Sequence, residues 1–558
     1  MASLRNSLLA LCAGAAVVLA DDHLVSRRHL SKRFIDEDGN YNMSIIHVND
    51  VHSHFVEFTS SGTDCTDKAK GCRGGVARIS AMATKLREQH PDSLFLNAGD
   101  ESQGTLFYTY YGAEKIAETL NYMKVDCFVP GNHEFDKGDD HLGDFLENLT
   151  FPVISANIVS DHPKLNKTIK PFFIYEQYEL AVIGVTTEST PSISKPGNGT
   201  KFTNAVQAVQ DTVDHIKSTT NIKRIVAVTH IGFQDDRALA KATTGIGMIV
   251  GGHSHTLLGN FSKTEGGYPT IEKSKDGDEV FIVTNWRWGE NIGYIDVTWD
   301  ADGKVVNYNG GPIPLSNLTA QDSELQAKVD EWGKPFEEFG AEVVGSSAVE
   351  LDQSICQQKE CLMGNLIADA MFEYRKNGST PEEAPDFALM NAGGIRASID
   401  DGPVTRKEVL TCFPFSNAVV EAVLTGDFVW KTVEGIVSDK NQQSGATIPT
   451  FLQVSSGTEI RYNPAAAVGS RLVSISINGA PLDKAKEYRV VTVDFLATGG
   501  DNVYSPVLGA LPVLDTLDEV LVQYLAARSP VTVEIEGRIK EVSCSSKKHR
   551  RGTREKGL

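Results

Sequence analysis

Between Asn42 and Pro314, five short apolar runs each end in an aspartate, a histidine or an asparagine. The runs alternate with stretches of helical periodicity, a pattern that is typical of a layered α/β fold. Ligands of such folds gather outside the carboxyl ends of the strands, so these polar residues are expected to share one rim. The runs and the polar residues after them are Ser44–Asn49 before Asp50 and His52, Leu94–Gly99 before Asp100, Phe128–Pro130 before Asn132 and His133, Ile225–Thr229 before His230, and Ile246–Val250 before His253 and His255.

Six of these residues supply the donor types that divalent metal ions use in proteins. Three imidazoles, two carboxylates and one amide oxygen suffice for two borderline ions that share a carboxylate. Zinc is expected, with manganese or another divalent ion as the alternative. We expect Asp100 to be the bridge, because Gly99 lets the backbone pack closely there. One strand-end aspartate more often caps the next helix, so the hypothesis depends on all six positions: Asp50, His52, Asp100, Asn132, His230 and His253.

The segment Gly131–Asp136 adds to this donor set a histidine that can act as a general acid and that a nearby carboxylate can orient. His133 directly follows the candidate ligand Asn132, and Asp136 lies three residues further on, where it can orient the imidazole. Two metal ions about 3.5–4 Å apart activate a water and hold both oxygens of an in-line phosphoryl displacement. Together these features predict an enzyme that hydrolyses phosphate esters.

The same residues stand in ordered motifs that resemble the 5'-nucleotidase family of metallophosphoesterases, which includes ecto-5'-nucleotidase and periplasmic UDP-sugar hydrolases. The resemblance covers about residues 42 to 543. It implies that the six residues bind two metal ions, that His133 and Asp136 form a dyad stabilising the transition state, and that His255 lies near the metal site. The motifs are Asn49-Asp50-Val51-His52, Asn97-Ala98-Gly99-Asp100, Gly131 to Asp136, Thr229-His230 and Gly251 to Thr256.

The resemblance also implies two domains joined by a helix. A four-layer metallophosphoesterase sandwich is expected over residues 42–317, and an α/β (α+β) nucleotide-recognition domain over residues 341–543. Between them, apolar residues recur every three to four positions, which predicts a helix over residues 318–340. The resemblance makes this helix the linker about which the second domain swings.

Five residues of the second domain are candidates for binding a nucleotide. Paired glycines let backbone approach a ligand, and an arginine fork suits phosphate or carboxylate. Two aromatic rings can stack on a nucleobase, and a carboxylate can accept hydrogen bonds from ribose hydroxyls. Core phenylalanines and a turn aspartate would explain the same residues without the family. The resemblance assigns substrate binding to Asn391, Arg396, Phe415, Phe495 and Asp501.

Two positions depart from the pattern of the family. Related ecto-5'-nucleotidases carry an arginine directly after the first cysteine of the Cys356–Cys361 loop, where this chain has Gln357. Without that cation, the affinity for a monophosphate and the preferred length of the phosphate chain can both differ from those of the related enzymes. His54, two residues after His52, also replaces an arginine that is common there.

The two ends of the chain predict a secreted protein. The apolar run Leu8–Leu19 is too short to span a bilayer and predicts a signal peptide over residues 1–20. Dibasic pairs suggest a pro-segment over residues 21–33, removed after Arg33, with a solvated tail as the alternative. No later segment predicts a membrane span. The basic tail, residues 544–558, is expected to be disordered, and it lacks the terminal apolar segment that a GPI anchor requires.

The cysteines and the glycosylation sequons also fit a secreted protein. Cys65 with Cys72, and Cys356 with Cys361, are close enough to bridge short loops in an oxidising compartment. Cys127, Cys412 and Cys544 stay unassigned, and at least one is expected to be a free thiol. Seven N-glycosylation sequons begin at Asn42, Asn148, Asn166, Asn198, Asn260, Asn317 and Asn377.

A net charge of −20 on 558 residues argues against a nucleic-acid polymer as partner. We therefore expect a secreted, extracellular monomer or homodimer that removes phosphate from nucleoside 5'-monophosphates of the AMP type. One alternative is a hydrolase of nucleoside di- or triphosphates, UDP-sugars or 2',3'-cyclic nucleotides with the same metal pair. Another is a nucleotide-sequestering protein without turnover.

Overall fold

The structure is a computed structural model that describes residues 35–36, 39–59, 65, 71–261, 264–415, 417–509, 511 and 513–542. The predicted signal peptide, pro-segment and basic tail, with Cys544, lie outside these residues. Among the described residues the chain forms two compact units, of which the first ends at Phe336 and the second begins at Glu337.

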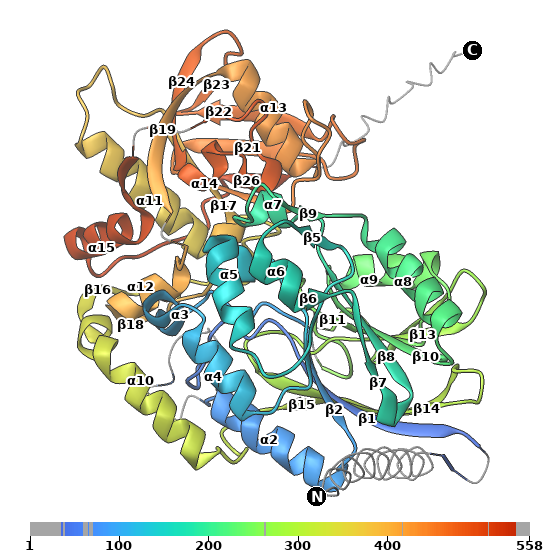
Figure 1. Ribbon diagram of the computed structural model, residues 1–558. Helices are drawn as coiled ribbons and strands as arrows, with labels where there is room; N and C mark the ends of the chain where they lie inside the picture. Colours follow the sequence, from blue (N-terminus) through green and yellow to red (C-terminus); the bar gives the residue numbers. More distant parts are fainter. Residues whose placement is uncertain are drawn as a thin grey trace, which may run out of the picture. The chain divides into compact units, whose positions relative to one another are not determined.

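The first unit contains a seven-stranded sheet with the strand order β15-β14-β1-β2-β3-β4-β6 (Figure 1). Strands β1 to β4 pair in parallel, and β14 pairs antiparallel with β1. The strands are β1 (Tyr41–Val48), β2 (Leu94–Asn97), β3 (Cys127–Phe128), β4 (Val153–Ile154), β6 (Ile169–Lys170), β14 (Asn291–Trp299) and β15 (Val305–Pro314).

A six-stranded sheet with the order β12-β13-β11-β10-β8-β7 packs against the first sheet. Its strands β8, β10, β11 and β13 are parallel. The strands are β7 (Phe172–Tyr175), β8 (Leu180–Thr186), β10 (Arg224–His230), β11 (Met248–Gly251), β12 (Thr270–Lys273) and β13 (Glu279–Val283). A separate two-stranded sheet pairs β5 (Ile158–Ser160) with β9 (Thr200–Phe202).

Alternation along the strands builds the four layers. In β10, Val226 and Val228 point into the core between the two sheets, whereas Ile225 and Ala227 face helices α8 and α9. On the outer face of the seven-stranded sheet, the α5 ring of Phe145 packs edge-on against Phe128 of β3. The helices are α2 (Val76–Gln89), α3 (Leu106–Tyr111), α4 (Glu114–Tyr122), α5 (Gly138–Glu147), α6 (Pro163–Thr168), α7 (Thr190–Ile193), α8 (Ala205–Thr219) and α9 (Phe233–Ala242).

The helix predicted over residues 318–340 is α10 (Ser323–Ala341), and the boundary between the two units falls within it. Its apolar face is buried: Leu325, Val329, Trp332 and Phe336 are each less than a tenth exposed. No helix of the described residues combines the length and the apolarity needed to cross a bilayer.

The second unit is built on a five-stranded sheet with the order β20-β17-β24-β19-β25 and a four-stranded sheet with the order β23-β22-β21-β26. Their strands are β17 (Phe387–Asn391), β19 (Ala418–Thr425), β20 (Leu452–Val454), β21 (Thr458–Tyr462), β22 (Leu472–Ile477), β23 (Ala480–Pro481), β24 (Glu487–Val493), β25 (Val513–Thr516) and β26 (Ile539–Glu541), and a further pair joins β16 (Val343–Ser347) to β18 (Gly402–Thr405). The helices are α11 (Leu362–Asn377), α12 (Arg406–Cys412), α13 (Gly426–Val437), α14 (Asp494–Ala497) and α15 (Leu517–Arg528).

The structure contains the disulfides Cys65–Cys72 and Cys356–Cys361. Cys127 and Cys412 are buried and form no disulfide.

Candidate active site

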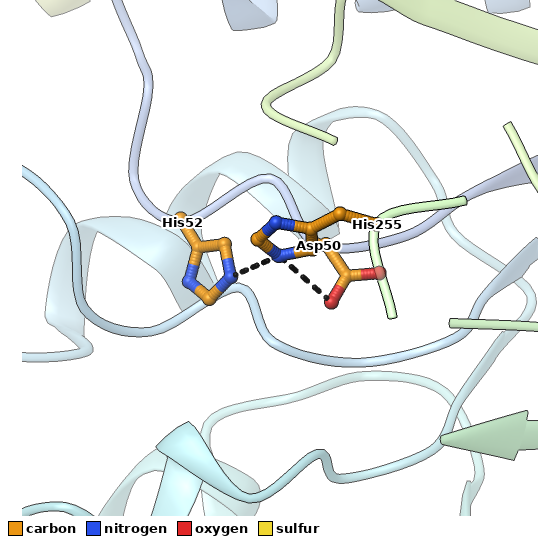
Figure 2. A group of neighbouring side chains, drawn as sticks. All are labelled: Asp50, His52 and His255. Carbon is orange, nitrogen blue, oxygen red and sulfur yellow. Dashed lines mark hydrogen bonds and ion pairs between the residues drawn. The ribbon is translucent and has the colours of Figure 1, made fainter. Parts of the chain in front are cut away.

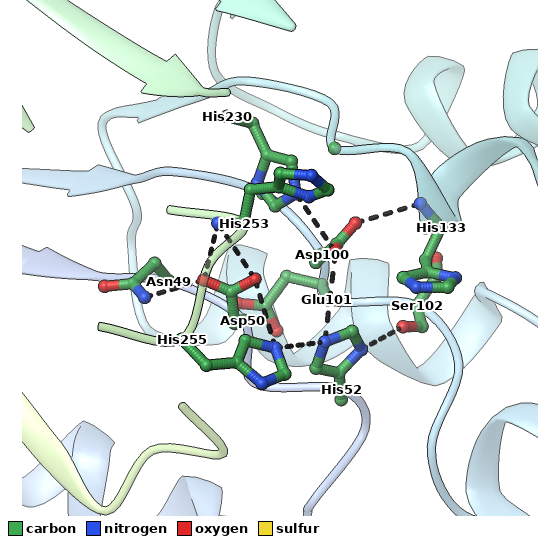
Figure 3. Close-up of polar contacts among 12 residues, drawn as sticks. Asn49, Asp50, His52, Asp100, Glu101, Ser102, His133, His230, His253 and His255 are labelled. Atoms are coloured by element: carbon green, nitrogen blue, oxygen red, sulfur yellow. Dashed lines mark hydrogen bonds and ion pairs between the residues drawn. The ribbon is translucent and has the colours of Figure 1, made fainter. Parts of the chain in front are cut away.

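The carboxyl ends of β1, β2, β3, β10 and β11 bring the predicted ligands to one place. Two clusters of side chains form there, and within each cluster the candidate ligand atoms lie within 4.8 Å of one another. The first donor group is Asp50, His52 and His255 (Figure 2), and the second donor group is Asp100, His230 and His253 (Figure 3).

In the first donor group, three candidate ligand atoms face one another. His52 Nε2 lies 3.1 Å from His255 Nε2, which lies 3.5 Å from Asp50 Oδ1. His52 Nδ1 donates to the carbonyl of Ser102 at 3.0 Å, so the neutral ring presents its lone pair on Nε2. Asn49 Nδ2 donates to Asp50 Oδ2 at 2.7 Å and fixes that carboxylate. Outer partners of this kind orient metal ligands.

The second donor group repeats this arrangement. His230 Nδ1 donates to the carbonyl of Ala98 at 2.6 Å, and its Nε2 lies 3.0 Å from Asp100 Oδ2. A proton or a metal ion has to lie between these two atoms. Burial disfavours the charged ring, but the Asp100 carboxylate outweighs burial and raises the pKa of His230 to about 10. Burial and then the charge of His230 lower the pKa of His253 to about 3, so its ring is a neutral donor.

Asp100 lies between the two donor groups. Its Oδ2 is also 3.8 Å from His52 Nε2, and its Oδ1 accepts a hydrogen bond of 2.9 Å from the backbone N–H of His133. Burial would raise the pKa of Asp100, but His230 and His133 hold it well below its usual value. An ionised carboxylate in contact with ligands of both groups is suited to bridge two cations.

The donor set fits a pair of divalent metal ions. Carboxylates and neutral imidazoles are the ligands of zinc and related borderline ions. Asn132 Oδ1 is buried and accepts no hydrogen bond from the described residues, and a buried acceptor of this kind is costly to leave without a partner. Asn132 directly precedes His133 at this rim, which places its amide oxygen among the ligand candidates.

Backbone strain marks the same loops. Asp50, His52, Asp100, His253 and His255 all have φ between 48° and 81°. Side chains other than glycine rarely take this left-handed conformation, which costs on the order of 1–3 kcal/mol per residue. All five residues lie in the turns that follow the strands and carry the candidate donor atoms.

The predicted dyad is formed beside the donor groups. His133 Nδ1 lies 2.8 Å from Asp136 Oδ2, and Ser194 donates to Asp136 Oδ1 at 2.7 Å. The His133 ring is edge-on to His52, with ring centroids 5.3 Å apart. The imidazole is therefore held in one orientation next to the first donor group.

His54, one of the two departures from the family pattern, is a buried and uncharged side chain. Burial lowers the pKa of His54 to about 3. Its ring stacks on Trp288 with centroids 4.5 Å apart, and the Arg287 guanidinium lies 3.8 Å from the centroid of the same indole. A positive charge is thus present next to His54, although not on it.

In the second unit, the predicted nucleotide residues form connected pairs. Asn391 Nδ2 donates to Asp501 Oδ2 at 2.8 Å, and burial raises the pKa of Asp501 to about 6. The Arg396 guanidinium lies 5.7 Å from the centroid of the Phe415 ring. Phe495 packs against Gly500, where a β-carbon would come within 2.5 Å of the ring.

Sequence reasoning missed several residues that support these side chains. Ser194 holds Asp136, Asn49 holds Asp50, and Thr450 accepts a hydrogen bond of 3.0 Å from the backbone N–H of Gly393. Gln357, which the sequence analysis singled out, is held in place because its Oε1 accepts a hydrogen bond of 3.0 Å from the Phe451 backbone N–H. Asn49 was within reach of sequence reasoning, as it adjoins Asp50; nothing in the spacing singles out Ser194 or Thr450.

The four-layer fold and its two donor groups define a metal-dependent phosphoric monoester hydrolase of the metallophosphoesterase class. Residues 43–257 match the family model of calcineurin-like phosphoesterases, and residues 343–509 match that of the 5'-nucleotidase C-terminal domain.

The relatives narrow this class to one family. The chain is 33% identical to a 5'-nucleotidase of Mus musculus over 90% of both chains, and 31% identical to a snake venom 5'-nucleotidase of Naja atra over 84% of this chain and 92% of the other. The crystal structure of a 5'-nucleotidase precursor from Thermus thermophilus superposes with a TM-score of 0.81 at 32% identity, covering 90% of this chain and 99% of that one. The chain belongs to the 5'-nucleotidase family.

Proposed function

We propose that this chain removes phosphate from extracellular nucleoside 5'-monophosphates of the AMP type, releasing nucleoside and phosphate. The observation that carries the proposal is the pair of donor groups with Asp100 between them, beside the His133–Asp136 pair. A protein that only sequesters nucleotides needs neither two metal sites nor a histidine held by a carboxylate.

The first unit supplies the chemistry. Asp50, His52, Asp100, Asn132, His230 and His253, with His255, would hold two divalent ions, zinc being the expected metal. Such ions, when bound, supply Lewis-acid activation of water and neutralise charge on phosphoryl oxygens. Asp136 fixes the His133 ring and favours its imidazolium form. The charged ring then stabilises the negative charge that develops on the phosphoryl group.

The second unit supplies recognition of the nucleoside. Phe415 and Phe495 offer aromatic faces to a base, and Asp501 offers a carboxylate oxygen to ribose hydroxyls. Arg396 carries a planar cation, and Asn391 is locked to Asp501 by their 2.8 Å hydrogen bond. Asn391 Oδ1 is buried without a hydrogen-bond partner among the described residues, so it is an acceptor for a ligand hydroxyl.

Gln357 supports a second candidate function. It is exposed and uncharged, and its amide oxygen is committed to the Phe451 backbone. A site without a cation at this position has less reason to prefer a monophosphate. Hydrolysis of nucleoside di- or triphosphates, UDP-sugars or 2',3'-cyclic nucleotides by the same metal pair is therefore the alternative.

A substrate panel on protein of defined metal content separates these functions. Hydrolysis of AMP, ADP, UDP-glucose and 2',3'-cyclic AMP, followed by chromatography of the products, should give the highest kcat/KM for AMP. A preference of tenfold or more for one of the other substrates would replace the first candidate by the second. Binding of AMP without release of phosphate would show a sequestering protein instead.

Secretion and glycosylation belong to the same proposal. The acceptor asparagines of all seven sequons are exposed, as a glycan requires. Expression in a eukaryotic secretory host should give protein in the medium whose mass falls on treatment with peptide N-glycosidase F. Protein retained in the cells, or an unchanged mass, would refute this part.

A further inference from the structure

The Glu134 carboxylate lies within the motif Gly131–Asp136, belongs to neither donor group, and is only 1% exposed. Each of its oxygens accepts two backbone hydrogen bonds. Oε2 accepts from Gly131 at 2.6 Å and from Asp100 at 3.0 Å, and Oε1 accepts from Glu101 at 3.0 Å and from Ser102 at 2.9 Å. One buried carboxylate therefore accepts hydrogen bonds from four backbone N–H groups.

Three of these N–H groups belong to consecutive residues, Asp100 to Ser102. Successive backbone N–H groups at a left-handed turn form a concave anion site, and Gly99 and Asp100 have φ of 85° and 55°. Here the anion is a side chain of the protein itself. It stabilises the strained turn that presents Asp100, and through Gly131 it ties this turn to the loop that carries Asn132.

The loop held by Glu134 is in turn hydrogen-bonded to the loop after β1, which carries Asp50 and His52 of the first donor group. The carbonyls of Gly99, Asp100 and Glu101 accept hydrogen bonds of 2.9, 3.0 and 2.9 Å from the N–H groups of Asp50, His52 and Ser53. The Ser102 carbonyl accepts from His52 Nδ1. Displacing the loop after β2 would therefore move Asp100 and also disturb the hydrogen bonds that place Asp50 and His52.

We propose that Glu134 is a positioning residue that sets the separation of the two donor groups and thereby their affinity for a metal pair. The proposal rests on the proposed function only in taking the two groups as metal sites. Glu134 acts through Asp100, Gly131 and the loop of His52, and it has no role in the chemical step.

The test is the variant Glu134→Gln, whose amide group places an N–H donor against backbone N–H groups. Outer partners of metal ligands typically contribute about 10–100-fold to metal affinity. The variant is expected to lose metal to a competing chelator at about 10–100-fold lower chelator concentration than the wild type. Saturating metal should then restore kcat to within a few-fold, because the groups that act on the substrate are intact.

Glu434→Gln is the matched control. Glu434 is likewise buried, and it accepts backbone hydrogen bonds from Arg471 and Leu472 and a hydroxyl hydrogen bond from Ser438, all in the second unit. This variant should lose thermal stability without any change in metal retention. A Glu134→Gln variant that holds two metal ions as tightly as the wild type would overturn the proposal.

Glu134→Asp keeps the charge but shortens the side chain, and it serves if the glutamine variant does not fold. Intermediate metal affinity is expected, whereas wild-type retention would again contradict the proposal. Metal retention is measured without substrate. A wild-type protein that binds two ions but hydrolyses no nucleotide would refute the proposed function and leave this inference standing.

Discussion

The two oxygens of the Asp136 carboxylate are divided between His133 and Ser194. Oδ2 lies 2.8 Å from His133 Nδ1, and Oδ1 accepts the Ser194 hydroxyl at 2.7 Å. Both distances lie within the ordinary range for hydrogen bonds. The Ser194 hydroxyl keeps the carboxylate from rotating away from the imidazole, so His133 keeps one orientation next to the first donor group.

Replacing His133 by alanine should lower kcat by about 10²–10⁴-fold, the range for loss of a positioned acid or base. The metal content should stay at the wild-type level, since His133 is outside both donor groups. Steady-state kinetics and elemental analysis of the same preparation check this. The pair His162–Asp140, with 3.0 Å between Nε2 and Oδ1 and a half-buried histidine outside both donor groups, is the control. His162→Ala should leave the rate unchanged. An unchanged rate in His133→Ala would refute the assigned role.

Ser194→Ala should lower kcat by about tenfold and leave KM unchanged. A hydrogen bond to a charged group contributes about 1.5 kcal/mol, and about 1.4 kcal/mol corresponds to a factor of ten in rate. Ser194→Thr keeps the hydroxyl and should recover most of the loss. If Ser194→Ala and Ser194→Thr lower kcat equally, and both lower thermal stability equally, the role of Ser194 is structural only.

His255→Ala should reduce the metal content from two ions per chain towards one. His255 supplies one of the three donors of the first group, and its Nε2 lies within 3.5 Å of both His52 Nε2 and Asp50 Oδ1. Elemental analysis after gel filtration measures the change. His215 is an exposed histidine on α8, and His215→Ala should keep both ions. Two tightly bound ions in His255→Ala would place this residue outside the metal site.

Asp501 predicts a pH-dependent contribution to stability. Burial raises its pKa from 3.8 to about 6, so the folded state binds this proton more tightly than the unfolded chain. The free energy of unfolding should therefore fall as pH rises through this interval, by up to ~3 kcal/mol. Asp501→Asn cannot ionise and should lose less stability between pH 4 and pH 7. Denaturant unfolding at both pH values checks this, and parallel losses in the two proteins would contradict it.

The strands of the first unit could be predicted because buried parallel strands are nearly continuous apolar runs. The five runs that end before Asp50, Asp100, Asn132, His230 and His253 correspond to β1, β2, β3, β10 and β11. The side chains at their ends were candidates because parallel strands place their carboxyl ends at one edge. The fold class was therefore readable from hydrophobic pattern and motif order.

Contacts between distant segments could not be predicted in this way. Ser194 is 58 residues from Asp136, and Asp501 is 110 residues from Asn391, so no periodicity links them. The sequence suggested that His255 lies near the metal site, but its place as a donor beside His52 depends on the left-handed turn at φ 48°. Glu134 stood inside a recognised motif, yet its four backbone partners become visible only when two loops are brought together.

Titration of metal-free protein with zinc or manganese tests the central claim most directly, with bound metal and phosphate release from AMP followed in the same samples. We expect no hydrolysis without metal, a rise in hydrolysis as the second ion per chain binds, and a maximum at two ions. Full activity at one ion per chain, or hydrolysis that persists after complete removal of metal, would contradict it.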